Sequence, residues 1–277
     1  MSALQGGLAG IRPAAARSSA AAALLEVRGL SRRFGGVTAV NEVTFSVAGS
    51  RIKGIIGPNG AGKTTLFNLI AGALAPHAGE VRFQGRRISG LAPHQVSARG
   101  IARTFQNVRL FAGMTVVETV MVGRHRHGHT GLVAGLLGLP SAAREERRSR
   151  AEAVAALERL GIGHMAEAQA TELALGHQRA VELARALALQ PALLLLDEPA
   201  AGLNMRETTE LARLIRTIQE DGVAVLLVEH DMSLVMDVCD ELVVISFGEK
   251  IAEGTPHQIQ SDPEVLRVYL GDDGAER

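Results

Sequence analysis

The run of residues 57–64 has the residue types and the spacing of a loop that binds phosphate. It reads Gly-Pro-Asn-Gly-Ala-Gly-Lys-Thr and fits the pattern Gly-x-x-x-x-Gly-Lys-Ser/Thr at every fixed position. Its glycines let the backbone turn tightly, so that N–H groups converge on anionic oxygens at a helix N-terminus. The lysine would reach the β- and γ-phosphates, and the threonine hydroxyl would ligate Mg²⁺.

The flanking residues favour this interpretation over a chance glycine-rich turn. An apolar run over residues 52–56 precedes the loop, as a buried strand should, and residues 65–70 follow with helical spacing. Strand, loop and helix are therefore in the order that phosphate binding requires. The residues expected to bind a nucleotide here are Gly57, Pro58, Asn59, Gly60, Ala61, Gly62, Lys63, Thr64 and Thr65.

A second segment ends in two carboxylates after a run of four leucines, at residues 193–196. Asp197 suits the outer shell of Mg²⁺, and Glu198 suits a base or a positioner for an attacking water. A leucine-rich strand that ends in acidic residues is common, so alone this pattern is ambiguous. Together with the phosphate loop it indicates hydrolysis of a nucleoside triphosphate.

Composition restricts the class of protein. The chain has 277 residues, of which 47% are hydrophobic, and Lys+Arg and Asp+Glu both number 29, so the formal net charge is zero. A balanced charge argues against a nucleic-acid-binding protein, which usually carries a basic excess. The single cysteine, Cys239, cannot form an internal disulfide, which fits a reducing cytosol.

No apolar stretch is long enough to span a bilayer. Residues 1–23 are rich in Ala and Gly, but Pro13, Arg17, Ser18 and Ser19 interrupt the continuous apolar middle that a signal peptide needs. We therefore expect residues 1–23 to be a disordered tail and the fold to begin near residue 24.

Hydrophobic periodicity predicts an α/β fold. Apolar runs at residues 52–56, 193–196, 223–228 and 242–245 are typical of parallel strands covered on both faces. Residues 24–30, 43–47 and 80–84 are expected to form further short strands. No strong strand is predicted between residues 106 and 189, where residues 144–160 and 178–189 favour helices. A helical region, over about residues 107–190, is thus inserted into an α/β nucleotide-binding core.

The ordered motifs resemble those of the ATP-binding subunits of ABC transporters, over about residues 24–271. They are, in order, residues 57–64, Gln106, 173–178, 193–198, 200–204 and His230. The resemblance implies a P-loop NTPase core with a small antiparallel β subdomain and an inserted helical subdomain. It also implies one nucleotide-binding domain over residues 24–271, followed by a tail at 272–277.

Finer features are similar to the LivG type of subunit, found in importers of branched-chain amino acids. They are Asp-Glu-Pro-Ala-Ala-Gly-Leu-Asn at residues 197–204, Glu-His-Asp-Met at 229–232, and Gly-Thr-Pro and Tyr-Leu-Gly near the C-terminus. Other cargo (urea or amides, or aromatic acids), export of lipopolysaccharide and a soluble ABC ATPase remain as alternatives. Zero net charge and the lack of a heptad run argue against the soluble class.

The resemblance assigns roles to three residues outside the two motifs already described. Phe34 would stack on adenine, although a core phenylalanine is a real alternative. Gln106 would approach the metal and the water, and its loop would sense a membrane subunit. His230 would hydrogen-bond the γ-phosphate; a lone histidine is more often structural, and its place after a predicted core strand favours the catalytic role.

The stretch that corresponds to the family signature Leu-Ser-Gly-Gly-Gln departs from it. Ala174 replaces the serine, Leu175 replaces the first glycine, and His177 replaces the glutamine, whereas Gly176 is retained. The resemblance implies that Ala174 and Gly176 face the ATP of the opposite subunit, at a helix that starts near His177. Loss of the serine removes one hydrogen bond, worth about 0.5–1.5 kcal/mol net, so the site is expected to be weakened and still functional.

The resemblance therefore implies an ATPase that uses ATP and Mg²⁺ and energises import of branched-chain or related amino acids. Its catalytic residues would be Glu198, His230 and Gln106, and its metal ligands Thr64, Gln106 and Asp197. Its partners would be membrane permease subunits, a second cassette in a head-to-tail dimer and, indirectly, a periplasmic substrate-binding protein. It would lie peripherally on the cytoplasmic face of the inner membrane.

Overall fold

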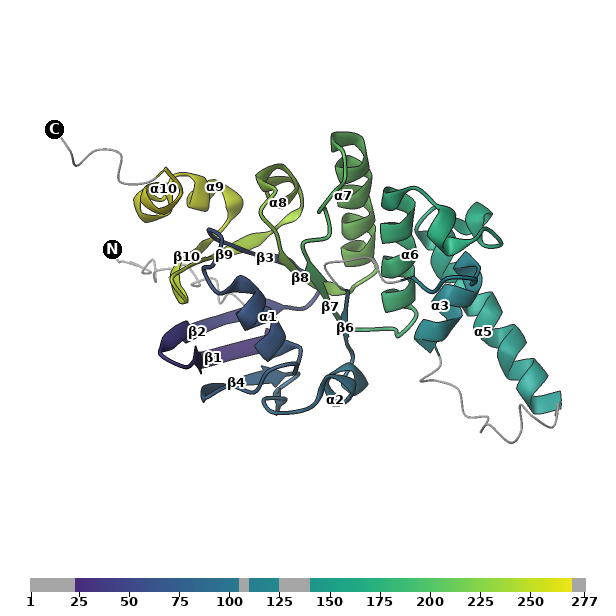
Figure 1. The fold of residues 1–277 in the computed structure, drawn as a ribbon, viewed down its shortest axis with the longest axis horizontal. Helices are drawn as coiled ribbons and strands as arrows, with labels where there is room; N and C mark the ends of the chain where they lie inside the picture. Colours follow the sequence, from purple (N-terminus) through teal and green to yellow (C-terminus); the bar gives the residue numbers. More distant parts are fainter. Residues whose placement is uncertain (1–22, 105–109, 125–139, 271–277) are drawn as a thin grey trace, which may run out of the picture.

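The computed structural model describes residues 23–104, 110–124 and 140–270 (Figure 1). Gln106, residues 1–22 and residues 271–277 lie outside the described residues. The division into a tail over 1–23, a cassette over 24–271 and a tail over 272–277 therefore stays a prediction.

The core of the molecule is a six-stranded sheet of order β10-β9-β3-β8-β7-β6. The strands from β9 to β6 pair in parallel, and β10 pairs antiparallel with β9. Their bounds are β3 Ile52–Ile56, β6 Ile101–Arg103, β7 Leu193–Asp197, β8 Ala224–Val228, β9 Glu241–Ser246 and β10 Glu249–Gly254.

The central strands are covered on both faces, as their apolar runs predict. Every residue of β3, β7 and β8 is buried. Leu194 and Leu196 belong to one core cluster, whereas Leu193 and Leu195 belong to the other. Because successive side chains of a strand point to opposite faces, a continuous leucine run is what a strand between two cores requires.

The second sheet has four antiparallel strands in the order β2-β1-β4-β5. Its strands are β1 Ala23–Phe34, β2 Val37–Ala48, β4 Ala78–Phe83 and β5 Arg86–Arg87. The helix α1 (Lys63–Ile70) contributes Leu66, Phe67 and Ile70 to the cluster that also holds the inner residues of β1, β2 and β4. This core therefore joins the two sheets around α1, and the implied antiparallel β subdomain is present.

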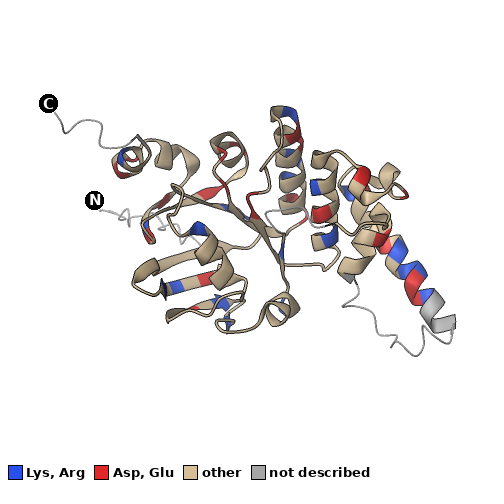
Figure 2. Cartoon of the chain, viewed as in Figure 1, with Lys and Arg blue, Asp and Glu red and all other residues tan. Residues whose placement is uncertain are grey.

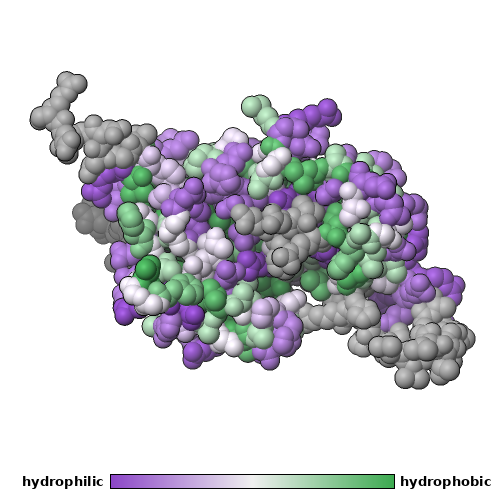
Figure 3. Space-filling model, viewed as in Figure 1, coloured by the Kyte–Doolittle hydropathy of each residue, from purple (hydrophilic) through white to green (hydrophobic). Residues whose placement is uncertain are grey.

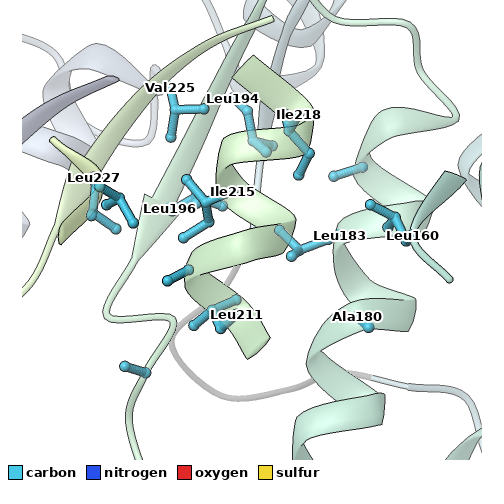
Figure 4. Packing of buried hydrophobic residues seen from close by; sticks show 14 of the residues in the cluster. Leu160, Ala180, Leu183, Leu194, Leu196, Leu211, Ile215, Ile218, Val225 and Leu227 are labelled. Carbon is cyan, nitrogen blue, oxygen red and sulfur yellow. The ribbon is translucent and has the colours of Figure 1, made fainter. Parts of the chain in front are cut away.

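Helices cover the other face of the large sheet. Figure 4 shows Leu211, Ile215 and Ile218 of α7 (Met205–Glu220) pointing toward Leu194, Leu196, Val225 and Leu227 of β7 and β8. Their spacing is that of one helical face. The helix starts at a capping box in which Asn204 accepts from the Glu207 N–H and the Glu207 side chain accepts from the Asn204 N–H.

The described part of the predicted helical region is helical. It contains α3 (Val116–Arg124), α5 (Pro140–Arg159) and α6 (Leu175–Leu187), with short 3-10 turns at Gly163–Met165 and Ala170–Glu172. Its one β feature among the described residues is an isolated bridge between Thr115 and Gln169. The other helices in the described part of the chain are α2 (Pro93–Ala98), α8 (Met232–Val238), α9 (Pro256–Gln260) and α10 (Pro263–Leu270).

Several boundaries differ from the sequence-based expectation. β1 runs on to Phe34 instead of ending at residue 30, because Arg32, Arg33 and Phe34 pair with β2 although their side chains are not core residues. The helix expected near His177 begins at Leu175. The strand β6 was not predicted, since three residues carry too short a pattern to recognise.

The surface is mixed in charge and in hydropathy. Figure 2 shows acidic and basic residues interspersed along α5 and α7, and Figure 3 shows hydrophobic and hydrophilic residues interspersed over the same face. Among the described residues, no helix combines the length and the apolar character needed to cross a membrane.

Cys239 lies at a tight contact between α8 and β3. Its side chain is 5% exposed, and a Cβ added at Gly54 would lie 2.9 Å from its Sγ and 2.6 Å from Cδ2 of Leu242. Only glycine therefore lets β3 approach these side chains this closely. Burial, followed by the charge of Asp240, raises the pKa of the Cys239 thiol to about 12.

We expect Cys239 to be unreactive in the native protein at pH 8, because the thiolate is the nucleophile and the raised pKa keeps the thiol protonated. The measurement is the rate of labelling by a chromogenic disulfide reagent, native and, as the positive control, in about 6 M guanidinium, above the midpoint of about 5 M beyond which a protein counts as hyperstable. Native labelling as fast as labelling of the unfolded chain would contradict the burial of this thiol.

Candidate nucleotide-binding site

The sequence-predicted site residues follow strands whose ends are level with one another. Val228 of β8 pairs with Ile55 of β3 on one side and with Asp197 of β7 on the other. The carboxyl ends of the three strands therefore meet at one edge of the sheet, where α/β folds bind their ligands. The phosphate loop, Glu198 and His230 all leave the sheet at this edge.

The backbone of the phosphate loop requires glycine at two positions. Gly57 and Gly62 have φ of 153° and 101°. A Cβ at Gly57 would lie 2.0 Å from the Ile245 carbonyl oxygen, and one at Gly62 would lie 2.2 Å from the Ala39 carbonyl oxygen. The loop is thus packed directly against the backbones of β9 and β2, and no larger residue fits.

The first turn of α1 presents hydrogen-bond donors. Gly62 is the N-cap and has no side chain to cap the helix, and the first turn holds no acidic residue. The N–H groups of a first helical turn have no partner within their own helix, and the helix dipole favours an anion there. Lys63 and Thr64 are the first residues of this turn, and Thr64 is exposed.

The Lys63 ammonium is held inside the loop. Its Nζ donates to the carbonyl oxygens of Gly57 (2.7 Å) and Pro58 (3.0 Å), and the residue is 7% exposed. Burial lowers the pKa of Lys63, and the negative charge of Glu198 acts in the opposite direction. The structure thus brings Glu198 into electrostatic range of the lysine, and an ammonium, with three donors, has one left for a third acceptor.

Glu198 itself sits on a constrained backbone. Its φ is 46°, a left-handed conformation that costs a residue other than glycine about 1–2 kcal/mol. Its N–H donates to the Val228 carbonyl (2.9 Å), and its carbonyl accepts from Ala201 N–H (3.1 Å). These bonds fix the turn that leads out of β7.

Asp197 is bound by an arginine that the sequence did not single out. Arg103, at the end of β6, donates to Oδ2 of Asp197 (2.9 Å) and to Oδ1 of Asn68 on α1 (2.7 Å). Its guanidinium also lies over the Phe67 ring, 5.3 Å from the centroid. Because Asn68 and Asp197 are far apart in sequence, spacing gave no signal for this bridge.

His230 follows β8 as predicted, and its side chain is 61% exposed. Its Nδ1 lies 3.7 Å from Oε2 of the preceding residue, Glu229, which is fully buried. Sequence reasoning did not single out Glu229, because a carboxylate beside a candidate histidine carries no spacing rule of its own.

Phe34 lies at the end of the β1–β2 hairpin. It is 45% exposed, so the alternative that it is a core phenylalanine is wrong. The Arg32 guanidinium lies 4.9 Å from the centroid of its ring. Phe34 pairs with Val37, and Ala39 of the same strand touches Gly62, so the hairpin end is close to the start of α1.

Two predicted residues lie away from the phosphate loop. Ala174 is the N-cap of α6 and Gly176 lies in its first turn, and Figure 1 places α6 apart from α1, with α7 between them in this view. A Cβ at Gly176 would lie 3.1 Å from Cγ of Glu207, at the start of α7. Gln106, the remaining predicted residue, is outside the described part of the chain.

The residues present fit a magnesium–nucleotide complex. Thr64 and Asp197 offer hydroxyl and carboxylate oxygens, the hard ligands that Mg²⁺ prefers, and Mg²⁺ typically takes few protein ligands and completes its shell with phosphates and water. Among the described residues, no group of three or more His, Cys, Asp or Glu side chains could hold a metal ion by itself.

These features together define a P-loop nucleotide-binding fold. They are a strand, a glycine-rich loop that encloses a lysine, a helix N-terminus and a second strand that leads into Asp-Glu. Comparison with known proteins narrows the class. The family model described as "ABC transporter" matches residues 40–201, and the model described as "Branched-chain amino acid ATP-binding cassette transporter" matches residues 249–275. The chain belongs to the ABC transporter family.

Curated relatives match over nearly their whole length. The chain is 47% identical to the high-affinity branched-chain amino acid transport ATP-binding protein BraF of Pseudomonas aeruginosa, over 90% of this chain and 98% of that protein. It is 46% identical to LivG of Escherichia coli K12, with the same coverage, and 32% identical to the lipopolysaccharide export system ATP-binding protein LptB of Haemophilus influenzae.

Solved structures confirm the fold. A nucleotide-free ATP-binding cassette from an ABC transporter superposes with a TM-score of 0.78 at 30% identity, covering 90% of this chain and 99% of that chain. A structure of the ADP conformation of such a cassette gives the same TM-score at 31% identity and the same coverage. The predicted P-loop NTPase fold is therefore correct.

We predict that Arg103→Ala lowers the free energy of unfolding by about 3 kcal/mol, the low end for removing one partner of a buried ion pair, because it leaves the Asp197 carboxylate, 6% exposed, without its cation. Urea denaturation measures the change. The matched control is Arg148→Ala, which removes an ion pair on α5 whose arginine is 80% exposed and should cost less than about 0.5 kcal/mol. Equal losses of unfolding free energy in the two variants would show that the buried Arg103–Asp197 pair stabilises the fold no more than an exposed ion pair does.

Proposed function

We propose that this chain is the ATP-binding and ATP-hydrolysing subunit of an importer for branched-chain or related amino acids. The observation that supports ATP hydrolysis is that the phosphate loop with Lys63 and the turn with Glu198 leave the sheet at one edge, where the strand ends are level. The cargo is supported by the names of the relatives BraF and LivG and by the C-terminal family match at residues 249–275.

In this proposal the phosphate loop and the start of α1 bind the phosphates of ATP. The residues are Gly57, Pro58, Asn59, Gly60, Ala61, Gly62, Lys63, Thr64 and Thr65. Backbone N–H groups and the start of α1 supply donors and a favourable dipole, and Lys63 neutralises charge on the β- and γ-phosphates. Phe34 carries an exposed ring at the nearby hairpin, where it stacks on the adenine.

Glu198 acts as the base or positioner of the attacking water, and His230 hydrogen-bonds the γ-phosphate. Thr64, Asp197 and Gln106 are the residues that we assign to hold Mg²⁺. When bound, that ion supplies positive charge to the phosphate oxygens. The chain's own contribution is therefore positioning and charge neutralisation, which dominate phosphoryl transfer.

Ala174 and Gly176 complete the site of a second cassette in a head-to-tail dimer. Their place supports this assignment, because α6 lies apart from α1, with α7 between them in the view of Figure 1. The first turn of α6 has no side-chain cap, so its N–H groups and dipole remain for an anion. The second cassette is either a copy of this chain or a sister subunit.

The remaining partners are permease subunits, reached through the segment that begins at Gln106, and indirectly a periplasmic substrate-binding protein. The subunit would sit peripherally on the cytoplasmic face of the inner membrane. Nucleic acid is not a partner in this proposal, in keeping with the zero net charge and the interspersed charges of the surface.

We predict that Glu198→Gln retains ATP but hydrolyses it at least about 100-fold more slowly, the low end of the effect of a general base. Steady-state turnover and equilibrium binding of labelled ATP measure the two properties. Lys63→Ala should lose binding itself, and Glu210→Gln, an exposed pair partner on α7, should leave both properties unchanged. Near-parental ATP turnover of Glu198→Gln would contradict the catalytic role assigned to Glu198.

The cargo is chosen by the permease and the binding protein, so it is tested in cells. Deletion of the gene should reduce uptake of labelled leucine, isoleucine or valine to the level of a permease deletion, and the Glu198→Gln gene should fail to restore it. Unchanged uptake with a defect in urea, amide or aromatic-acid uptake would identify another cargo. A lipopolysaccharide defect would favour the LptB-like alternative, which the lower identity of 32% makes the weaker candidate.

A further inference from the structure

Glu229 is a fully buried carboxylate whose oxygens are bonded to two separate loops. It is 0% exposed. One oxygen, Oε1, accepts from the Ala200 N–H (2.8 Å), and the other, Oε2, accepts from the N–H groups of His230 (2.9 Å) and Asp231 (3.2 Å). Burying an ionisable carboxylate is unfavourable unless such donors satisfy it, so this placement is a strong constraint.

The two loops carry the group that we assign to the attacking water, Glu198, and the group that we assign to the γ-phosphate, His230. Ala200 lies two residues after Glu198, and that turn is also joined to β8 by the bond from Glu198 N–H to the Val228 carbonyl. His230 and Asp231 form the loop that leads into α8. One side chain therefore fixes the distance between the Glu198 turn and the His230 loop.

The same turn packs against the start of α6, which we assign to the site of a second cassette. A Cβ at Gly202 would lie 3.2 Å from Cδ2 of Leu175. Gly176 lies against Glu207, the residue that exchanges hydrogen bonds with the N-cap Asn204 at the start of α7. A shift of Ala200 would therefore be transmitted by direct contact to the start of α6.

Glu229 is not placed to act on the substrate itself. Both of its oxygens accept backbone hydrogen bonds and none of its surface is exposed, so it cannot receive a proton from an attacking water in this arrangement. A role through other residues fits the geometry instead.

We infer that Glu229 is a positioning residue for ATP hydrolysis, which holds the Glu198 turn and the His230 loop in register with each other. The inference rests on the proposed roles of Glu198 and His230. Its carboxylate is needed because a glutamine in its place would present an NH₂ donor to one of the two sets of N–H donors. One loop would then lose its acceptor and move.

The test uses the full-length chain, alone and co-purified with its natural partner subunits. Glu229→Gln should lower kcat by about 10-fold or more, the size expected for the loss of one charge-assisted hydrogen bond. KM for Mg-ATP and the affinity for labelled ATP should change less than about 3-fold, because the affected groups act in the transition state. Glu229→Asp keeps both oxygens on a shorter stem and should recover about half of the lost activity on a logarithmic scale, which leaves kcat about 3-fold or more below the parent.

The matched control is Glu253→Gln, which removes a partly buried carboxylate from its pair with Lys53, on the opposite end of the sheet from the loops in question. It should affect thermal stability but leave kcat unchanged. Parental kcat in Glu229→Gln, a loss confined to KM, or the same kcat loss in Glu253→Gln would each overturn the inference.

If Glu229→Gln does not fold, Glu229→Asp alone decides. A kcat about 3-fold or more below the parent at unchanged KM supports positioning, and parental kcat refutes it. Failure of the proposed function is distinguishable. In that case the parent itself would not hydrolyse ATP or Glu198→Gln would be as active as the parent, whereas a wrong inference leaves both of those results as proposed.

Discussion

The candidate site depends on the backbone ladder that holds β3, β8 and β7 level with one another. Parallel pairing aligns Ile55, Val228 and Asp197 across three adjacent strands, so each following residue leaves the sheet at the same edge. A slip of one residue in any strand would invert its side chains between the two cores and carry its loop away from the others. Leucine, isoleucine and valine on both faces of these strands make such a slip unfavourable.

This rigid base supports loops that are individually unfavourable. Gly57 and Gly62 adopt conformations that only glycine enters readily, and Glu198 adopts a left-handed one with a side chain attached. The strain at Glu198, about 1–2 kcal/mol, persists only where the surroundings determine the conformation. Contacts of the loop with the backbones of β2 and β9, and hydrogen bonds from the Glu198 turn to β8, supply that support.

The sequence predicted what local pattern controls and missed what distant contacts control. Unbroken apolar runs located β3, β7, β8 and β9 to within one residue at each end, since burial on both faces leaves a pattern that needs no partner to recognise. The phosphate loop was found because its spacing is dictated by its own backbone. Arg103 and Glu229 were missed because their partners lie on other elements, and no periodicity links them. The motif placed Ala174 and Gly176 near a helix N-terminus, but neither the cap at Ala174 nor the start of α6 two residues before His177 could be read from it.

Packing around Gly54 limits which substitutions relatives of this chain can accept. The space that its absent methyl would need is occupied by the side chains of Leu242 and Cys239, so the three positions share one fixed volume. A larger side chain at residue 54 requires a smaller side chain at residue 242, at residue 239 or at both. If substitutions occur one at a time, the smaller side chain must come first and leaves a void in the core, so packing sets the order of the replacements.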